Sequence, residues 1–516
     1  MTGARPTSDG EPRRKERYPH LFSPGLIGGV TIPNRIVQAP MGTGMIDRGR
    51  VTDRDIAFQE ERASAGVGLI ITAAAPVHPT STIGGRILTE AWDEGGVEDL
   101  RRRVDAVHHH GTRIFGQLLH LGREAAGDTQ AGGGTDFVPI APSAIPSPRN
   151  ASPPHEMTTS EVRMIVRAFG RSAENFKQAG YDGIEIQACH GYLTAQFMTP
   201  SANRRTDAYR GDTLEGRMRF LIEVMEEMRS RCGCDYPVGV RLNAEDLEPG
   251  GLTFDDTLEI VDALQSAAPA DYVSITTGAR GAYVKDMTFD EGFARGFSEA
   301  VKEGVDVPVI VTGRFRMPDV AEEALASGQS DFIGFGRPLL ADPEWARKAR
   351  EGKVAEIRPC IGCLQECRRA NGLIGCTVAA RTGREADWGA NGQPGERRRV
   401  VIAGGGPAGL EAARVAAEDG HEVVLFERSA RLGGQLRIAA AGPTREELLD
   451  FVFFAERQLA PAPQVSGPSR PDASARRGFG HDRRRGRHRH WPSADSRAWP
   501  GPGPRQPANR TSGRRE

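Results

Sequence analysis

Short apolar runs alternate with longer stretches whose apolar residues recur at helical spacing. Runs of four or five apolar or β-branched residues are typical of buried strands, and the longer amphipathic stretches are typical of helices. Strands followed by helices, eight times in about 330 residues, predict an α/β fold, a closed parallel (β/α)8 TIM barrel. An open doubly wound sheet is the alternative. The expected strands are Ile36–Ala39, Gly68–Thr72, Ile114–Leu118, Gly183–Ile186, Val238–Leu242, Tyr272–Ile275, Val309–Thr312 and Phe332–Phe335, and the expected helices include Ser160–Ala179, Leu214–Arg229, Asp255–Gln265 and Pro318–Ser327.

Most of the residues that follow these strands are polar or glycine. In a barrel the chemistry lies at the carboxyl ends of the strands, so these residues are the candidates for a site. Each alone has an ordinary explanation, such as a turn or a surface ion pair, but their shared position at the strand ends favours a binding site. They are Pro40, Met41, Gly42, Gln117, His120–Arg123, Gln187, His190, Tyr192, Arg241, Gly313, Arg314, Gly336 and Arg337.

Two glycine–arginine pairs, Gly313-Arg314 and Gly336-Arg337, follow the last two strands. Barrels commonly bind phosphate there, through backbone N–H groups of glycine turns and an arginine fork. Arg241 would place a fixed cation beside the N1/O2 edge of a flavin, and Gln117 would hydrogen-bond its pyrimidine ring. The barrel is therefore predicted to hold a flavin that carries a phosphate.

Four of the seven cysteines lie within seventeen residues, at Cys360, Cys363, Cys367 and Cys376. Thiolates are soft ligands, and four in one short segment suit a 4Fe–4S cluster or a structural zinc ion. A place between two redox-cofactor domains favours the cluster. Disulfides are disfavoured because the Arg-rich N-terminus has no apolar secretory region, and a cytoplasmic location is expected.

A strand, a glycine turn, a helix, a second strand and an acid follow one another from Val400. This is a strong dinucleotide-binding signal, because the glycines let the backbone approach a pyrophosphate at the helix N-terminus and the acid accepts from a ribose hydroxyl. The parts are Gly404, Gly406 and Gly409, a helix over Leu410–Glu418, a strand over Glu422–Phe426, and Glu427.

In content and order these motifs resemble the old yellow enzyme superfamily, and within it the long iron–sulfur branch that contains 2,4-dienoyl-CoA reductase and trimethylamine dehydrogenase. The resemblance extends from about residue 20 to 455. The segments that carry it are Pro33–Ile36, Gly68–Thr72, Gln117–Arg123, His190–Leu193, Asn203–Gly211, Arg217–Phe220 and the cysteine segment.

The resemblance implies FMN in the barrel, a 4Fe–4S cluster on the four cysteines, FAD in the next domain and NAD(P)H as hydride donor. It also implies reduction of a C=C bond conjugated to a carbonyl or a thioester. Tyr192 would supply the proton, while Gln187 and His190 would hold the substrate oxygen, with His190 polarising it as a charged imidazolium. Gln435 lies in a segment similar to the FAD-contacting segment of relatives.

Some positions depart from the family pattern. Gln187 stands where alkene reductases carry a histidine. Ala282 stands where dienoyl-CoA reductases carry one, so Tyr283 or Arg280 would substitute. Trimethylamine dehydrogenases tether FMN through a cysteine in the motif that reads Pro40-Met41-Gly42 here, so amine oxidation is disfavoured and FMN is expected to be non-covalent. The spacing between the third and fourth cysteines is shorter than in relatives but still suits a four-cysteine cluster.

The predicted organisation is a disordered N-terminus (1–19), an FMN-binding barrel (20–350), a cluster segment (351–383), a linker (384–399), a partial FAD-binding Rossmann unit (400–460) and a disordered tail (461–516). The tail has thirteen arginines and no lysine, leucine or isoleucine, so it cannot bury enough apolar surface to fold. It reads like a coding sequence in the wrong frame, with a basic tail that binds nucleic acid or a partner as the alternative. FAD is expected to bind weakly or not at all.

Overall charge and hydropathy narrow the function classes. A net charge of -1 over 516 residues does not suit a protein built as a whole to hold nucleic acid or a membrane surface, and no apolar run is long enough to predict a transmembrane helix. The expected partner is a small unsaturated carbonyl or acyl-CoA substrate. The hypotheses, in order, are a flavin-dependent reductase, an amine or similar donor dehydrogenase, and a truncated inactive product.

Overall fold

The computed structural model describes residues 17–81, 87–125, 138–149, 152–368, 372–388, 396–459 and 465–466. The predictions for the N-terminus, the linker and the Arg-rich tail fall outside these ranges, apart from 17–19, 384–388, 396–399 and 465–466. Within the described part of the chain, no helix is long and apolar enough to cross a membrane.

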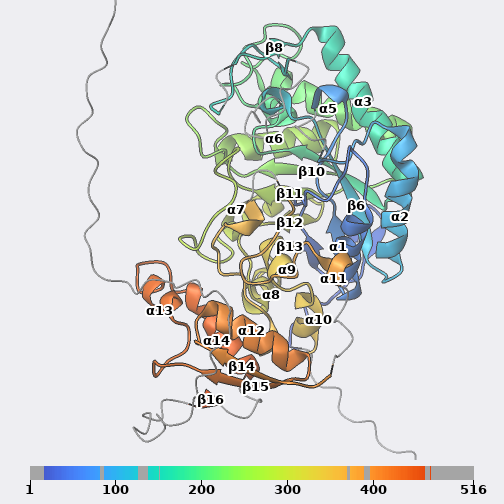
Figure 1. Ribbon diagram of the computed structural model, residues 1–516. Coiled ribbons are helices and arrows are strands. Elements are labelled where there is room, and N and C mark those ends of the chain that lie inside the picture. The colour runs from blue at the N-terminus through green and yellow to red at the C-terminus, as the bar shows by residue number, and fades with distance from the viewer. Residues whose placement is uncertain are drawn as a thin grey trace, which may run out of the picture. The chain divides into compact units, whose positions relative to one another are not determined.

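Eight parallel strands form a closed barrel. Each strand pairs with the next in this series, and the circle closes because β13 pairs with β3. The closed barrel is therefore confirmed over the open sheet. Figure 1 shows these strands surrounded by helices. The strands are β3 (Ile36–Gln38), β4 (Leu69–Ile71), β6 (Arg113–Leu119), β9 (Gly183–Ala188), β10 (Val238–Asn243), β11 (Val273–Thr276), β12 (Val309–Val311) and β13 (Phe332–Phe335), with a short β5 (Ala75–Pro76) beside β6.

The outer helices begin at polar caps and present apolar faces to the strands. The long helix α3 starts at a capping box, in which Thr158 and Glu161 each bond the other's backbone N–H. Its buried residues, such as Ile165 and Phe169, recur at three- and four-residue spacing. The helices are α1 (Asp53–Ser64), α2 (Val97–His108), α3 (Thr159–Gln178), α4 (Leu193–Met198), α5 (Leu214–Cys232), α6 (Phe254–Ala267), α7 (Arg295–Glu303), α8 (Pro318–Ala326), α9 (Arg337–Ala341) and α10 (Trp345–Arg350).

Alternation along the strands separates two environments. Aliphatic residues of β6, β9, β10 and β11, for example Ile186 and Val240, join the core cluster that includes the helices. The residues between them face the barrel interior, since side chains alternate along a strand. Toward the carboxyl ends of the strands these inward residues are polar. The strand register sets Gln187, Arg241 and Ser274 side by side.

Toward the amino ends of the strands the barrel interior is apolar. A hairpin of β1 (Gly25–Ile27) and β2 (Val30–Ile32) contributes Ile27 and Ile32 to a separate cluster with Phe115, Tyr272 and other residues at the start of the strands. Gly239 makes room there, because a Cβ on it would lie 2.1 Å from the Tyr272 ring. The apolar floor confines polar chemistry to the carboxyl end of the barrel.

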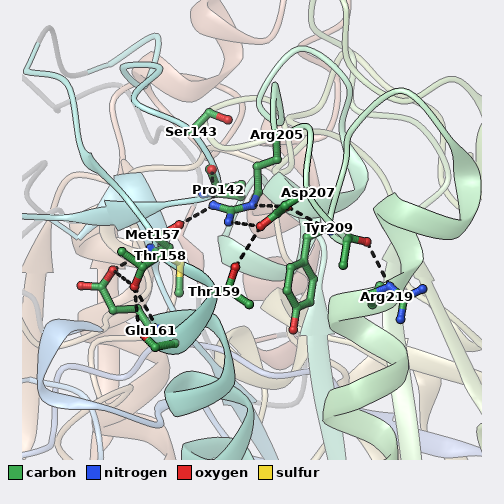
Figure 2. Close-up of polar contacts among 12 residues, drawn as sticks. Pro142, Ser143, Met157, Thr158, Thr159, Glu161, Arg205, Asp207, Tyr209 and Arg219 are labelled. Carbon is green, nitrogen blue, oxygen red and sulfur yellow. Dashed lines mark hydrogen bonds and ion pairs between the residues drawn. The ribbon is translucent and has the colours of Figure 1, made fainter.

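The Asn203–Gly211 segment, part of the resemblance noted above, is a structural brace (Figure 2). The Arg205 guanidinium donates to the carbonyl oxygens of Pro142 (3.0 Å) and Met157, and pairs with Asp207 through two contacts. These carbonyls flank the short strands β7 (Ile140–Ala141) and β8 (His155–Glu156), which pair with each other. Asp207 also accepts from the Thr159 hydroxyl at the start of α3. The segment thus joins a loop, a two-stranded sheet and a helix.

A Rossmann-like unit follows the cysteine segment. Strands β14 (Arg399–Ala403), β15 (Glu422–Phe426) and β16 (Val465–Ser466) form a parallel three-stranded sheet. Helices α12 (Pro407–Glu418) and α14 (Leu448–Leu459) bury Leu410 and Val452 in a common cluster with Leu425. A short helix α13 (Gln435–Ala439) lies between β15 and α14 in sequence, and α11 (Glu385–Trp388) precedes the unit.

Candidate active site

The loop after β9 brings Gln187, His190 and Tyr192 together at the carboxyl end of the barrel. His190 has a φ of 61°, a left-handed conformation that is uncommon for a residue other than glycine. Gly191 continues the turn with a φ of 74°, and Tyr192 caps the N-terminus of α4. The rings of His190 and Tyr192 lie edge to face, with centroids 6.5 Å apart. Backbone strain of this kind is concentrated at functional sites.

A hydrogen bond fixes the tautomer of His190. The amide Nε2 of Gln187 lies 3.3 Å from Nδ1 of His190. Since Nε2 of an amide can only donate, Nδ1 accepts and the ring proton resides on Nε2. That Nε2 is buried and has no partner among the described residues, and neither has Oε1 of Gln187. The pair therefore presents one donor and one acceptor to a ligand.

His190 is neutral rather than the charged imidazolium expected from the sequence. Burial lowers its pKa well below the usual 6.5, and the positive charges of Arg241 and Arg368 lower it further. The expectation failed because it rested on the motif alone, which does not show the neighbouring arginines. A neutral imidazole with its proton on Nε2 still donates a hydrogen bond.

Tyr192 keeps its proton. Burial, followed by the neighbouring Tyr283, raises the pKa of its phenol above the usual 10.0. The guanidinium of Arg280 lies 5.8 Å from the Tyr192 ring centroid and approaches Glu124 at 3.5 Å. Tyr283 stacks on His190 with centroids 4.5 Å apart, so both residues predicted to replace the missing histidine of the loop after β11 lie next to the motif.

A buried carboxylate beneath this motif was not identified from the sequence. Glu185 lies two residues before Gln187 on the inner face of β9, and its Oε1 accepts from Nε2 of Gln117 at 2.6 Å. Burial raises the pKa of Glu185 and the charge of Arg241 lowers it. The amide donor of Gln117, predicted to reach a flavin, is thus bound to Glu185. The signal in the sequence was an acid at an inward position of a buried strand.

Backbone groups, more than arginine side chains, form the candidate phosphate site. The N–H groups of Gly313, Arg314, Gly336 and Arg337 have no acceptor among the described residues. The guanidinium of Arg314 is turned away, because it donates to the carbonyl of Asp286 (2.7 Å) and pairs with Glu447. The prediction of an arginine fork at Arg314 thus differs from the structure, since a distant acid of the chain binds it.

Arg337 also faces elsewhere. It lines the cavity of the cysteine segment, and its Nη1 has no partner in the described part of the chain. Pro40, Met41 and Gly42 follow β3 as predicted, and a Cβ on Gly336 would lie 3.3 Å from the sulfur of Met41. The ends of β3 and β13 therefore adjoin.

The inner face fits a flavin mononucleotide. Buried polar atoms without a partner among the described residues line it, as a bound polar ring would require. Four backbone N–H groups at adjacent strand ends suit its phosphate. The unpartnered side-chain atoms are Nε of Arg241, Oγ of Ser274, Oγ1 of Thr277, Oγ1 of Thr312, Oε1 of Gln187 and Nε2 of His190.

The four cysteines line one small cavity of about 20 Å³ with Leu340 and Ile361. All four thiols are free, and burial raises the pKa of Cys367 to about 11 and that of Cys376 to about 12. In the described residues no three cysteines, histidines or acids come together at metal-binding distances. The donor set suits a soft metal, but the four sulfurs are not arranged as ligands in this structure.

The glycine fingerprint of the Rossmann-like unit forms the expected turn. A Cβ on Gly409 would lie 1.9 Å from the carbonyl oxygen of Gly404, and Gly406 caps α12. Glu427, at the end of β15, accepts from the N–H groups of Gly405 (2.7 Å) and Ser429 (2.8 Å), and these bonds lower its pKa. Gln435 begins α13 after two glycines with positive φ. Whether these residues contact FAD stays a prediction.

Comparison with known proteins gives consistent relatives. Residues 20–356 match the family described as NADH:flavin oxidoreductase / NADH oxidase, and residues 399–454 match FAD dependent oxidoreductase. An NADH oxidase of Thermoanaerobacter brockii is 37% identical over 456 residues, covering 86% of this chain and 69% of the relative. A cinnamate reductase of Clostridium sporogenes is 37% identical over 466 residues, covering 82% of this chain and 66% of the relative.

The similar solved structures are oxidoreductases, like the relatives found by sequence. A 2-naphthoyl-CoA reductase in complex with 2-naphthoyl-CoA superposes with a TM-score of 0.81 at 31% identity, covering 86% of this chain and 70% of that one. A histamine dehydrogenase from Rhizobium sp. 4-9 gives 0.79 at 28% identity, covering 87% and 66%. The chain spans about two thirds of the length of these relatives. It belongs to the NADH:flavin oxidoreductase / NADH oxidase family, a group of flavin-dependent oxidoreductases.

Proposed function

We propose that this oxidoreductase reduces a C=C bond conjugated to a carbonyl or thioester, with reducing equivalents from NAD(P)H through FMN. The observation that carries the proposal is the buried Nε2–H of His190, which Gln187 fixes and which has no acceptor among the described residues, beside a protonated Tyr192. A carbonyl oxygen is the acceptor that such a donor lacks. Similarity to cinnamate reductase and 2-naphthoyl-CoA reductase supports the same reaction class.

When bound, FMN supplies a hydride to the β-carbon of the substrate. The carbonyl oxygen gains negative charge at that moment, and the Nε2–H of His190 stabilises it. A neutral imidazole serves here, because its N–H is preorganised by the bond to Gln187 and no proton has to leave the ring.

Tyr192 protonates the α-carbon. Its raised pKa keeps the phenol protonated at neutral pH, as a general acid requires, and it adjoins the imidazole that would hold the substrate. The 6.5 Å between the two ring centroids suits a donor for the oxygen and a donor for a carbon two bonds away.

A donor dehydrogenase is the second candidate, supported by similarity to histamine dehydrogenase and to an N,N-dimethylglycine/sarcosine dehydrogenase. Its substrates would be amines. Cations, however, lie against the aromatic rings that an ammonium group would need, with Arg280 at 5.8 Å from Tyr192 and Arg368 at 4.9 Å from Tyr283. The reductase is therefore preferred.

A substrate screen tests the proposal. The purified, FMN-loaded protein is assayed without oxygen for loss of NAD(P)H in the presence of enones, enoates, enoyl-CoA esters and methylated amines. We expect turnover with at least one unsaturated acyl compound and loss of about 100-fold in kcat/KM for His190→Ala. Oxidation of an amine with no alkene reduction would instead support the dehydrogenase.

A further inference from the structure

The cysteine segment contacts the active site through Arg368. This residue ends a single 3-10 turn, Glu366–Arg368, directly after Cys367. Its Nη1 donates to the Tyr283 hydroxyl at 2.7 Å, and its guanidinium carbon lies 4.9 Å from the Tyr283 ring centroid. Tyr283 stacks on His190 at an interplanar angle of 27°. A continuous series of contacts thus runs from the segment to the residue that would hold the substrate oxygen.

Arg368 is a cation at the edge of the described part of the cysteine segment. No carboxylate of the described residues pairs with it, whereas Arg280 on the other side of the site approaches Glu124 at 3.5 Å. The charge of Arg368 reaches the site, because it helps to lower the pKa of His190. The side chain is exposed, and its hydrogen bond and ring contact orient the guanidinium toward Tyr283.

Most of the guanidinium is available to a ligand. An arginine has five N–H donors in a planar fork, and the contacts among the described residues use one of them, toward Tyr283. A fork held at the edge of a site binds an oxyanion through two parallel hydrogen bonds. A solvated surface arginine would lack both the fixed orientation and the link to the catalytic histidine.

We propose that Arg368 binds an anionic group of the substrate and selects anionic over neutral and cationic compounds, with Tyr283 as the residue that positions it. The inference rests on the proposed reductase function and narrows its substrate class. The oxyanion is either the carboxylate of an unsaturated acid or a phosphate of an acyl-CoA ester, since both present the same chemistry to a guanidinium.

Paired substrates separate the charge from the alkene. Cinnamate is compared with methyl cinnamate, and crotonyl-CoA with crotonyl-pantetheine, in the wild type, Arg368→Gln and Arg368→Lys. For Arg368→Gln we expect kcat/KM of an anionic member to fall about tenfold or more, mainly through KM, while its neutral partner changes less than about twofold. Arg368→Lys restores much of the loss because it keeps the charge.

The two pairs identify the source of the anion. A change confined to the cinnamate pair assigns the site to a carboxylate, and one confined to the thioester pair assigns it to a phosphate. A second readout needs no turnover, namely calorimetric binding of 3-phenylpropanoate and of its amide to the FMN-loaded protein. We expect Arg368→Gln to weaken binding of the acid alone.

Arg384→Gln is the matched control. Arg384 is also exposed and lies 5.1 Å from an aromatic ring, that of Trp388, but has no contact with the active-site motif among the described residues. It should leave both pairs unchanged. An unaltered preference for anionic members in Arg368→Gln overturns the inference while reduction of methyl cinnamate leaves the proposed function standing. Failure of the wild type to reduce any member overturns the proposed function itself.

Discussion

At the residue scale, His190 and Tyr192 are proposed to act on different atoms of the substrate. The imidazole donates from Nε2 without changing its charge, because Gln187 holds Nδ1 as an acceptor. The phenol transfers a proton and must therefore be an acid at the working pH. Replacing His190 should weaken the stabilisation of negative charge on the substrate oxygen, whereas replacing Tyr192 should slow protonation of the α-carbon.

Tyr192→Phe removes the proton donor and keeps the ring. We expect the alkene-reducing half-reaction to slow by about 10²–10⁴-fold, the usual contribution of a general acid, while reduction of the flavin by NAD(P)H is unchanged. Anaerobic stopped-flow spectroscopy separates the two half-reactions. Equal slowing of both in Tyr192→Phe would show that the tyrosine has a structural role.

The pKa shifts predict a flat pH profile. The pKa of His190 lies well below 6.5, so the ring is neutral at neutral pH and gains a proton only in more acidic solution. The pKa of Tyr192 is raised above 10.0, so its proton is lost only in strongly alkaline solution. The rate of alkene reduction should therefore stay constant between about pH 6 and pH 9. An inflection near the ordinary histidine pKa that disappears in His190→Asn would contradict this assignment.

The sequence predicted most of these residues because strand ends can be located from apolar runs. The limits of the apolar runs were predicted to within one or two residues of the observed strands. These runs contain or precede Gln187, His190, Tyr192 and Arg241. Arg314 was assigned to phosphate and Arg368 to nothing, since their orientation is set by Glu447 and Tyr283, which are distant in the chain. The charge of His190 was missed for the same reason.

At the scale of elements, the brace around Arg205 shows that a recognisable motif can be structural. The buried guanidinium satisfies two backbone carbonyls and one carboxylate that join β7, β8 and the start of α3 (Figure 2). None of these contacts includes the residues of the active site. The order of the motif in the chain identified the family, and its contacts explain why the fold needs it.

Arg205→Ala should destabilise the barrel. It leaves the carbonyls of Pro142 and Met157 without the donor that Arg205 supplies and removes the ion pair of Asp207, at a cost of about 2–4 kcal/mol. Thermal unfolding followed by circular dichroism should show a melting temperature lower by several degrees. Arg210→Ala is the control, because the pair of Arg210 with Asp212 is exposed and its loss should leave the melting temperature unchanged.

The elements themselves were predictable. Each of the eight expected barrel strands overlaps an observed one, because buried parallel strands read as continuous apolar runs. The predicted helix starts lie close to the observed ones, because capping residues such as Thr158 and Thr253 precede the helices. The hairpin β1–β2 and the short strands β7 and β8 were not predicted, because segments of two or three residues carry too little pattern.

At the scale of the whole molecule, the chain combines a barrel, a cysteine segment and a Rossmann-like unit. The four cysteines share a cavity but are not arranged as ligands. To bind a metal, the buried thiols of Cys367 and Cys376, whose pKa values are raised, must lose their protons.

Iron analysis tests the cysteine segment. If it holds a 4Fe–4S cluster, protein purified without oxygen should contain about four iron atoms per chain. Cys376→Ser should lower the iron content and leave FMN bound, because the flavin site is built from the barrel strands. Zinc in place of iron, in wild-type protein, would show that the segment has a structural metal.

The most direct test is a single-turnover measurement on the wild-type protein. FMN-loaded protein is reduced with NAD(P)H in the absence of oxygen and mixed with an unsaturated acyl compound, and the flavin absorption is followed. For the proposed reductase we expect rapid return of the oxidised flavin spectrum together with one equivalent of saturated product, and both should be strongly slowed in His190→Ala. Persistence of the reduced spectrum with every unsaturated compound, together with bleaching of the oxidised protein by an amine, would contradict it.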